Sequence, residues 1–232
     1  MPLKKIRREL KKHSSKTKAK LLQGYFKTGP GEYAEGDIFI GVTVPALRNI
    51  SKQFSGVGLK TALKLLKSPI HEERLLALLI LILQYRASGF KGKEEIYREY
   101  LKHTKYINNW DLVDVTAKNI VGDFLRDKDK SVLYQLAKSG YLWDRRIAVL
   151  STFHFIGHRE FDDAMKIAGI LLSDEHDLIH KAVGWMLREV GKKDLSVEEK
   201  FLKKHCKRMP RTMLRYAIER FPVRKRRLYL YN

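Results

Sequence analysis

A tryptophan and a carboxylate stand four residues apart in the segment 108–122. Asn108 or Asn109 can cap a helix start there, so a helix would carry Trp110 and Asp114 on one face. Asp111 directly follows the tryptophan, so we expect it to point away from that face and to cap the helix start. The residues expected in the buried stripe are Leu112, Val113, Val115, Ile120 and Val121.

The charges of this pair indicate a definite chemistry. A purine alkylated at N3 or N7 is cationic, so it leaves without a general acid, and its departure builds positive charge on the sugar. A carboxylate such as Asp114 stabilises that charge and can orient the attacking water. Indole faces attract cations, which suits Trp110 and Trp185, and a guanidinium such as Arg146 holds phosphate well. The segment therefore predicts cleavage of a glycosidic bond.

Several blocks of the chain carry a family resemblance. They are Trp-Asp-x-Val-Asp at 110–114, Gly31–Asp37, Gly41–Val42, Val44–Arg48, Trp143–Ala148 and Lys181–Glu189. Together the sequence resembles the DNA alkylation-repair glycosylases of the AlkD type, which are built from HEAT-like helical repeats. The resemblance implies a monofunctional hydrolase that acts on alkylated double-stranded DNA as a monomer and leaves the damaged base in the duplex.

The same resemblance gives the candidate residues their roles. The predicted catalytic residues are Trp110, Asp114 and Trp185. The DNA-contacting residue that the resemblance implies is Arg146, and Arg145, Lys181 and Arg188 are further predicted DNA contacts. No cofactor is expected. The histidines show no metal-ligand spacing with acidic or cysteine partners, so no metal is expected either.

Composition limits the possible partners. The chain has 47 Lys and Arg against 26 Asp and Glu, a net charge of +21 that is spread from Lys4 to Arg227. That charge predicts affinity for polyanions, either nucleic acid or an anionic membrane surface. We expect no membrane partner, because no helix pattern combines a broad exposed apolar face with a basic one. A merely basic or ribosome-associated protein stays an alternative.

The compartment follows from cysteine use and from the longest apolar run. Cys206 is the only cysteine, which suits a reducing cytosol. The charged start is not a secretory signal, and the run from Leu75 to Leu83 is far shorter than the roughly 20 residues of a membrane helix. We predict a cytoplasmic protein that is associated with the nucleoid when bound to DNA.

Helical patterning dominates the chain, so the predicted class is all-α. Residues 3–28 read as one or two basic helices, and 29–43 form a glycine-rich loop that either packs beneath them or lies near the substrate. The helices predicted after the loop are 44–54, 57–67, 71–88, 93–103, 109–125, 129–138, 143–157, 161–173, 177–191, 195–206 and 210–221. The basic tail 220–232 either touches phosphate or is solvated.

Buried-type alanines recur along these helices at Ala77, Ala117, Ala148, Ala182 and Ala217. Their spacing is that of stacked helix pairs, and basic residues near the helix starts recur with it: Arg74, Arg146, Lys181 and Arg215. We predict one HEAT-like solenoid domain over residues 1–232 with a concave basic face. An ordinary helical bundle, and a non-catalytic module that binds nucleic acid, remain the alternatives.

Overall fold

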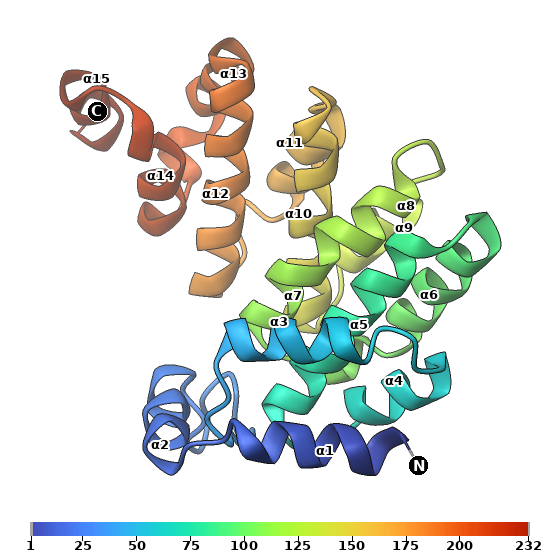
Figure 1. The fold of residues 1–232 in the computed structure, drawn as a ribbon. Helices are drawn as coiled ribbons and strands as arrows, with labels where there is room; N and C mark the ends of the chain where they lie inside the picture. Colours follow the sequence, from blue (N-terminus) through green and yellow to red (C-terminus); the bar gives the residue numbers. More distant parts are fainter. Residues whose placement is uncertain (1, 232) are drawn as a thin grey trace. The chain divides into compact units, whose positions relative to one another are not determined.

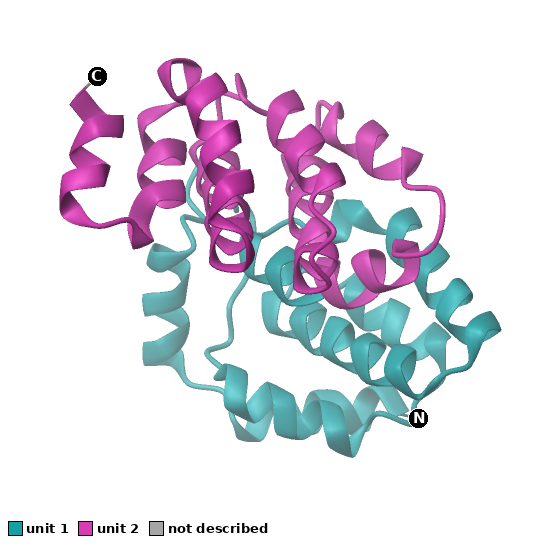
Figure 2. Cartoon of the chain, turned by 90° about the horizontal axis from the view of Figure 1, so that it is seen from above, with its two compact units in different colours: residues 1–116 teal, residues 117–232 magenta. Residues whose placement is uncertain are grey.

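The computed structural model describes residues 2–231, and its regular structure in that range is helical (Figure 1). No β-strand forms in that range, where one isolated parallel bridge joins Ile38 to Ile70. The all-α prediction is confirmed. The chain divides into two compact units, residues 1–116 and 117–232 (Figure 2). A single HEAT-like domain over the whole chain stays a prediction.

Unit 1 is built around one apolar helix, α5. Its helices are α1 (Pro2–Lys12), α2 (Lys16–Tyr25), α3 (Val44–Gln53), α4 (Leu59–Leu66), α5 (His71–Ala87), α6 (Phe90–Lys102), the 3-10 turn η1 (Thr104–Tyr106) and α7 (Trp110–Ala117), which ends at the unit boundary. Helices α3, α4 and α6 pack on α5, and α1 covers α3 and α4 (Figure 1). Residues 75–82 of α5 are apolar on every side, so the helix is enclosed rather than amphipathic.

Unit 2 is an array of helix pairs. It contains the π-turn η2 (Lys118–Gly122), α8 (Asp123–Leu125), α9 (Ser131–Ala137), α10 (Leu142–Gly157), α11 (Asp162–Ile170), α12 (Asp177–Lys193), α13 (Leu195–His205), η3 (Cys206–Arg208), α14 (Arg211–Ala217), η4 (Ile218–Arg220) and α15 (Val223–Tyr231). Helix α12 packs between α10 and α14. Helix α9 packs on α10, α11 packs on both α10 and α12, and α13 packs on α12. The pairs begin at Ser131, Asp162 and Leu195, about one predicted repeat apart.

The alanines that carried the repeat pattern are packing positions. All five are at most 1% exposed. A methyl side chain lets neighbouring helices approach, which explains why small residues recur at this spacing. Two features were not predicted: the π-turn at Lys118–Gly122 inside the continuous helical segment, and a helix, α15, in the basic tail. No helix within residues 2–231 is long and apolar enough to cross a membrane.

The 29–43 loop of unit 1 is anchored by a buried carboxylate. Glu72, on the first turn of α5, is 2% exposed and accepts the backbone N–H groups of Ile40, Gly41 and Val42 at 2.7–3.3 Å. Ser15, the N-cap of α2, donates its N–H to the carbonyl of Ile40 at 3.0 Å. The end of the loop is therefore held between α2 and α5, as the packing interpretation predicted.

Gly41 shows how close this contact is. Its φ is +79°, and a Cβ at this position would lie 2.1 Å from the carbonyl oxygen of Ser15. Gly31 has a similar φ of +74°, but no atom lies within 4 Å of its Cβ position. Both positions would strain the backbone of a residue with a side chain, but only Gly41 would also bring that side chain against another atom. Substitutions at the two glycines therefore distinguish backbone strain from steric overlap.

We predict that Gly31→Ala lowers the free energy of unfolding by roughly 1–2 kcal/mol, the cost of a left-handed conformation with a side chain. Gly41→Ala should cost distinctly more, because it adds displacement of the α2 backbone to the same strain. Urea titrations of both variants measure the difference. Equal losses would mean that the loop does not need close approach at Gly41.

Candidate functional site

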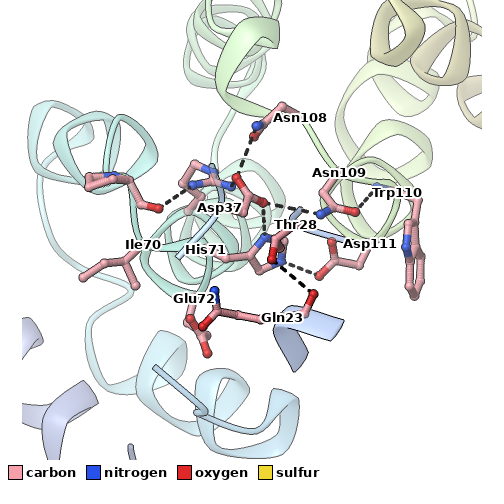
Figure 3. A network of polar contacts seen from close by, with 12 residues as sticks. Gln23, Thr28, Asp37, Ile70, His71, Glu72, Asn108, Asn109, Trp110 and Asp111 are labelled. Carbon is pink, nitrogen blue, oxygen red and sulfur yellow. Dashed lines mark hydrogen bonds and ion pairs between the residues drawn. The ribbon is translucent and has the colours of Figure 1, made fainter. Parts of the chain in front are cut away.

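Trp110 begins α7 and stands half-buried against an aromatic layer of unit 1. Its ring stacks on Phe26 with centroids 5.1 Å apart and meets Tyr25 edge-on at 6.1 Å. The side-chain oxygen of Asn109 accepts the Trp110 backbone N–H at 2.8 Å (Figure 3), so Asn109 supplies an acceptor at the helix start as predicted. Ring contacts and a hydrogen bond of its backbone N–H therefore both hold Trp110 in place.

Asp114 lies one turn further along α7 and is half-buried. Since residues four apart share a helical face, α7 places Trp110 and Asp114 on the same side of the helix, and their joint role in a site stays a prediction. Leu112 and Val113, which lie between them in the chain, are fully buried. Helix α7 thus presents an indole and a carboxylate from one face of unit 1.

Asp111 does not cap the helix, so that expectation is wrong. Its Oδ2 lies 2.8 Å from Nε2 of His71, and its Oδ1 is buried with no hydrogen-bond partner (Figure 3). His71 is 2% exposed and stands on the first turn of α5. The carboxylate that follows Trp110 therefore joins α7 to α5.

The other ring nitrogen of His71 meets a second carboxylate. Nδ1 lies 3.0 Å from Oδ2 of Asp37, which comes from the 29–43 loop (Figure 3). Arg74 donates to Oδ1 of Asp37 at 2.6 Å, and the amides of Asn108 and Asn109 donate to the same carboxylate at 3.4 Å. Four side chains, two from α5 and two from the segment before α7, thus contact Asp37. We call Asp37, His71, Arg74 and Asp111 the polar clamp.

The protonation of the clamp follows from its geometry. Burial raises the pKa of Asp37, but hydrogen bonding to His71 and the charge of Arg74 outweigh burial and hold that pKa below its usual value. Burial lowers the pKa of His71, but hydrogen bonds to Asp111 and Asp37 outweigh burial and raise it above its usual value. Asp37 is therefore ionised at neutral pH, and the clamp favours the protonated form of His71.

An apolar cavity of about 400 Å³ lies beside the clamp in unit 1. Leu21, Leu22 and Phe39 contribute to its wall, and His71 and Asp111 reach its edge. Leu21 is 68% exposed, so the cavity opens to solvent at α2. Its lining is aliphatic and aromatic, which suits the packing of apolar groups better than the binding of an ion.

Trp185 belongs to unit 2 and is half-buried on α12. Phe153 meets its ring edge-on at 5.6 Å, and its Nε1 donates to Oε1 of Glu189 at 3.1 Å. The preceding Gly184 allows close packing, because a Cβ there would lie 2.4 Å from the carbonyl oxygen of Met213 on α14. The indole is therefore fixed by its own helix and by α10.

Arg146 and Arg145, the two arginines of α10, are both engaged within unit 2. Arg146 is 5% exposed and donates from Nη1 to the carbonyl of Leu178 at 2.5 Å, which links α10 to α12. Arg145 is half-buried and donates from Nε to Asp174 at 2.7 Å. Phosphate binding by these residues stays a prediction, and the burial of Arg146 gives that residue a packing role as well.

The remaining predicted DNA contacts of unit 2 lie on α12. Lys181 pairs with Asp177 at 2.7 Å, and its side chain is 39% exposed. Arg188 pairs with Glu219, and its side chain is 17% exposed. Lys181 is therefore the more accessible cation of the two. Within residues 2–231 no three His, Cys, Asp or Glu side chains gather as metal ligands would.

The predicted site residues divide between the units. Trp110 and Asp114 lie in unit 1, and Arg145, Arg146, Lys181, Trp185 and Arg188 lie in unit 2 (Figure 2). Their convergence on one concave basic face stays a prediction. One member of the expected basic face is corrected: Arg74 is 3% exposed and bonded to Asp37, so it lies in the core.

Sequence reasoning missed the polar clamp, although a signal was present. His71, Glu72 and Arg74 precede the most apolar run of the chain. Charged groups at the start of an enclosed helix need buried partners. The glycine-rich loop that carries Asp37 was the segment able to supply one.

Stacked helix pairs define the molecule as an all-α helical-repeat protein. A solved structure described as a predicted DNA alkylation repair enzyme from Enterococcus faecalis has a similar fold, with a TM-score of 0.70 and 16% sequence identity over 91% of this chain and 98% of that one. The sequence model of the DNA alkylation repair enzyme family matches residues 6–221. The chain therefore belongs to that family. No curated protein matches it.

Proposed function

We propose that the protein is a DNA glycosylase that hydrolyses the N-glycosidic bond of cationic N3- or N7-alkylated purines in duplex DNA. Family membership supports DNA alkylation repair as the process. The observation that supports the reaction is the pairing of an indole and a carboxylate, Trp110 and Asp114, on one face of α7. Such a pair suits a cationic base that leaves a sugar on which positive charge develops.

The reaction needs no proton donor at the base. As the bond between C1′ and the purine nitrogen breaks, its electron pair neutralises the cationic purine. Positive charge then grows at C1′ and the ring oxygen of the sugar, where the Asp114 carboxylate stabilises it. Water adds to C1′ and loses a proton to solvent or to Asp114. The products are a neutral alkylpurine and an abasic site.

The tryptophans favour the cationic lesion. A ring held on one face by stacking, as Trp110 is on Phe26, can present its other face to a cation without losing conformational freedom on binding. Trp185 has the same rigidity through Phe153 and Glu189. In this proposal the protein acts as a monomer with HEAT-like repeats, holds the duplex through basic side chains, and leaves the damaged base unflipped. It works in the cytoplasm, on nucleoid DNA.

The first prediction concerns the charge of Asp114. Asp114→Asn keeps the shape of the side chain and removes its charge, so release of 7-methylguanine from methylated duplex DNA should slow by roughly 10²–10³. Binding to undamaged duplex should hold or strengthen, because a repulsion with phosphate disappears. Asp162→Asn, which removes an exposed carboxylate from α11, is the charge-matched control and should leave the rate unchanged.

A stable Asp114→Asn protein that releases base at the parent rate would contradict the catalytic assignment. The protein would then be better described as a helical-repeat module that binds nucleic acid without chemistry. Melting temperatures of both variants separate this outcome from simple unfolding.

The second prediction concerns the DNA interface. Affinity for duplex DNA should fall steeply with salt and depend little on sequence, with a contribution of roughly −0.9 to the log–log slope from each neutralised phosphate. Lys181→Gln should make the slope shallower by about one such contribution. Fluorescence anisotropy at several salt concentrations measures it. Lys166→Gln on α11, also exposed, controls for net charge, and an unchanged slope for Lys181→Gln would remove Lys181 from the interface.

A further inference from the structure

The polar clamp joins the start of α7 to the rest of unit 1. Asp37 lies in the 29–43 loop, His71 and Arg74 lie on α5, and Asp111 lies on α7 beside Trp110. The clamp is buried, with Asp37, His71 and Arg74 each at most 5% exposed. The first turn of α7 is joined to α5 by the hydrogen bond between Asp111 and His71 (Figure 3).

His71 must carry two ring protons to make these bonds. Both of its nitrogens face carboxylate oxygens, at 3.0 Å and 2.8 Å, and an ionised carboxylate can only accept. A neutral imidazole has one N–H, so its other nitrogen would direct a lone pair at a carboxylate. Between two ionised carboxylates, the observed geometry therefore favours an imidazolium.

Charge balance within the clamp depends on that second proton. The charged groups that face His71 are Asp37 from the loop, Asp111 from α7 and Arg74 from its own helix, so the imidazolium makes two cations and two anions. Its neighbour Glu72 is bonded to loop amides. The His71 ring stacks on Phe39 with centroids 4.4 Å apart and lies tilted against Phe26 at 5.2 Å. Loss of the proton would leave one uncompensated negative charge in a buried site.

Two routes connect His71 to Trp110. The polar route runs through Asp111, which is the next residue in the chain. The aromatic route runs through Phe26, which touches the His71 ring and stacks on the Trp110 ring at 5.1 Å. A change at His71 therefore acts on both the backbone and the ring of Trp110.

We propose that His71 is a positioning residue for base excision: as an imidazolium between Asp37 and Asp111 it fixes the first turn of α7, and loss of its second ring proton releases Trp110 and Asp114 from their working arrangement. This inference rests on the proposed function, because it gives the indole and the carboxylate their roles. His71 itself is too deeply buried to touch the substrate.

The pH dependence has a definite sign. Burial lowers the pKa of His71, but its two carboxylate partners raise that pKa by more. The pKa therefore lies above its usual value. The stabilisation is complete below the unfolded-state pKa, about 6.5, and is lost as pH rises through the higher folded-state pKa. Excision should therefore fall as pH rises through the folded-state pKa of His71, which lies above its usual value.

The test compares His71→Gln with a matched control. The side chain of glutamine can donate a hydrogen bond to one of the two carboxylates but not to both. Excision should therefore slow by roughly 10- to 100-fold, the scale for a displaced reacting group, while duplex affinity stays within about twofold. The alkaline loss of activity should vanish from its pH profile. Glu73→Gln is the control, since Glu73 is 2% exposed on the same turn of α5 but bonds to Arg7 on α1.

A readout without activity keeps the inference separate from the proposed function. In a protein with Trp143→Phe and Trp185→Phe, Trp110 is the only fluorophore of its kind, and its emission should change as pH rises through the His71 titration. Adding His71→Gln should abolish that change. If the parent releases no base but the emission titrates, the proposed function fails and positioning of Trp110 stands.

Two results would overturn the inference. One is a Trp110 emission that does not respond to pH between 6 and 10 in the protein that retains His71. The other is an equal loss of excision rate in His71→Gln and Glu73→Gln proteins that have lost the same melting temperature. His71 would then contribute stability alone.

Discussion

A buried carboxylate is tolerated only where its charge is matched, and Asp37 is 5% exposed. Its partners come from different parts of the chain, so pairing them brings the 29–43 loop, the start of α5 and the start of α7 to one point. An apolar cluster of the same size would stabilise the unit as well, but it would leave the direction of α7 less defined. The carboxylate makes the first turn of α7 specific, and Trp110 and Asp114 inherit that specificity.

Local pattern was sufficient for most of the fold. Apolar periodicity predicted the helices, and the structure places α10 at Leu142–Gly157 and α12 at Asp177–Lys193, within two residues of the predicted limits. Such agreement is expected where a helix buries apolar residues, because the apolar pattern lies within one short segment of the chain. The basic tail was different: α15 has little apolar periodicity and is held by a bond from Arg211 to its last turn, which no local pattern contains.

The same contrast between local pattern and distant contacts applies to the site. Trp110 and Asp114 share a face because they are four residues apart, so helical geometry alone predicts their pairing. Asp111 was misassigned because its partner, His71, is 40 residues away. The chain needed a partner for each charge at the start of α5, and sequence spacing does not say which distant carboxylate supplies it. Arg74 was misplaced on a surface for the same reason, although its position before an enclosed apolar run indicated burial.

Lesion charge tests the proposed chemistry most directly. The measurement is base release by the wild-type protein from two duplexes of one sequence, one with cationic 7-methylguanine and one with a neutral lesion such as 1,N6-ethenoadenine. A carboxylate that stabilises a cationic sugar, with indoles that attract a cationic base, predicts release from the first duplex and little or none from the second. Equal rates on the two lesions, or binding of both duplexes without release, would contradict the account.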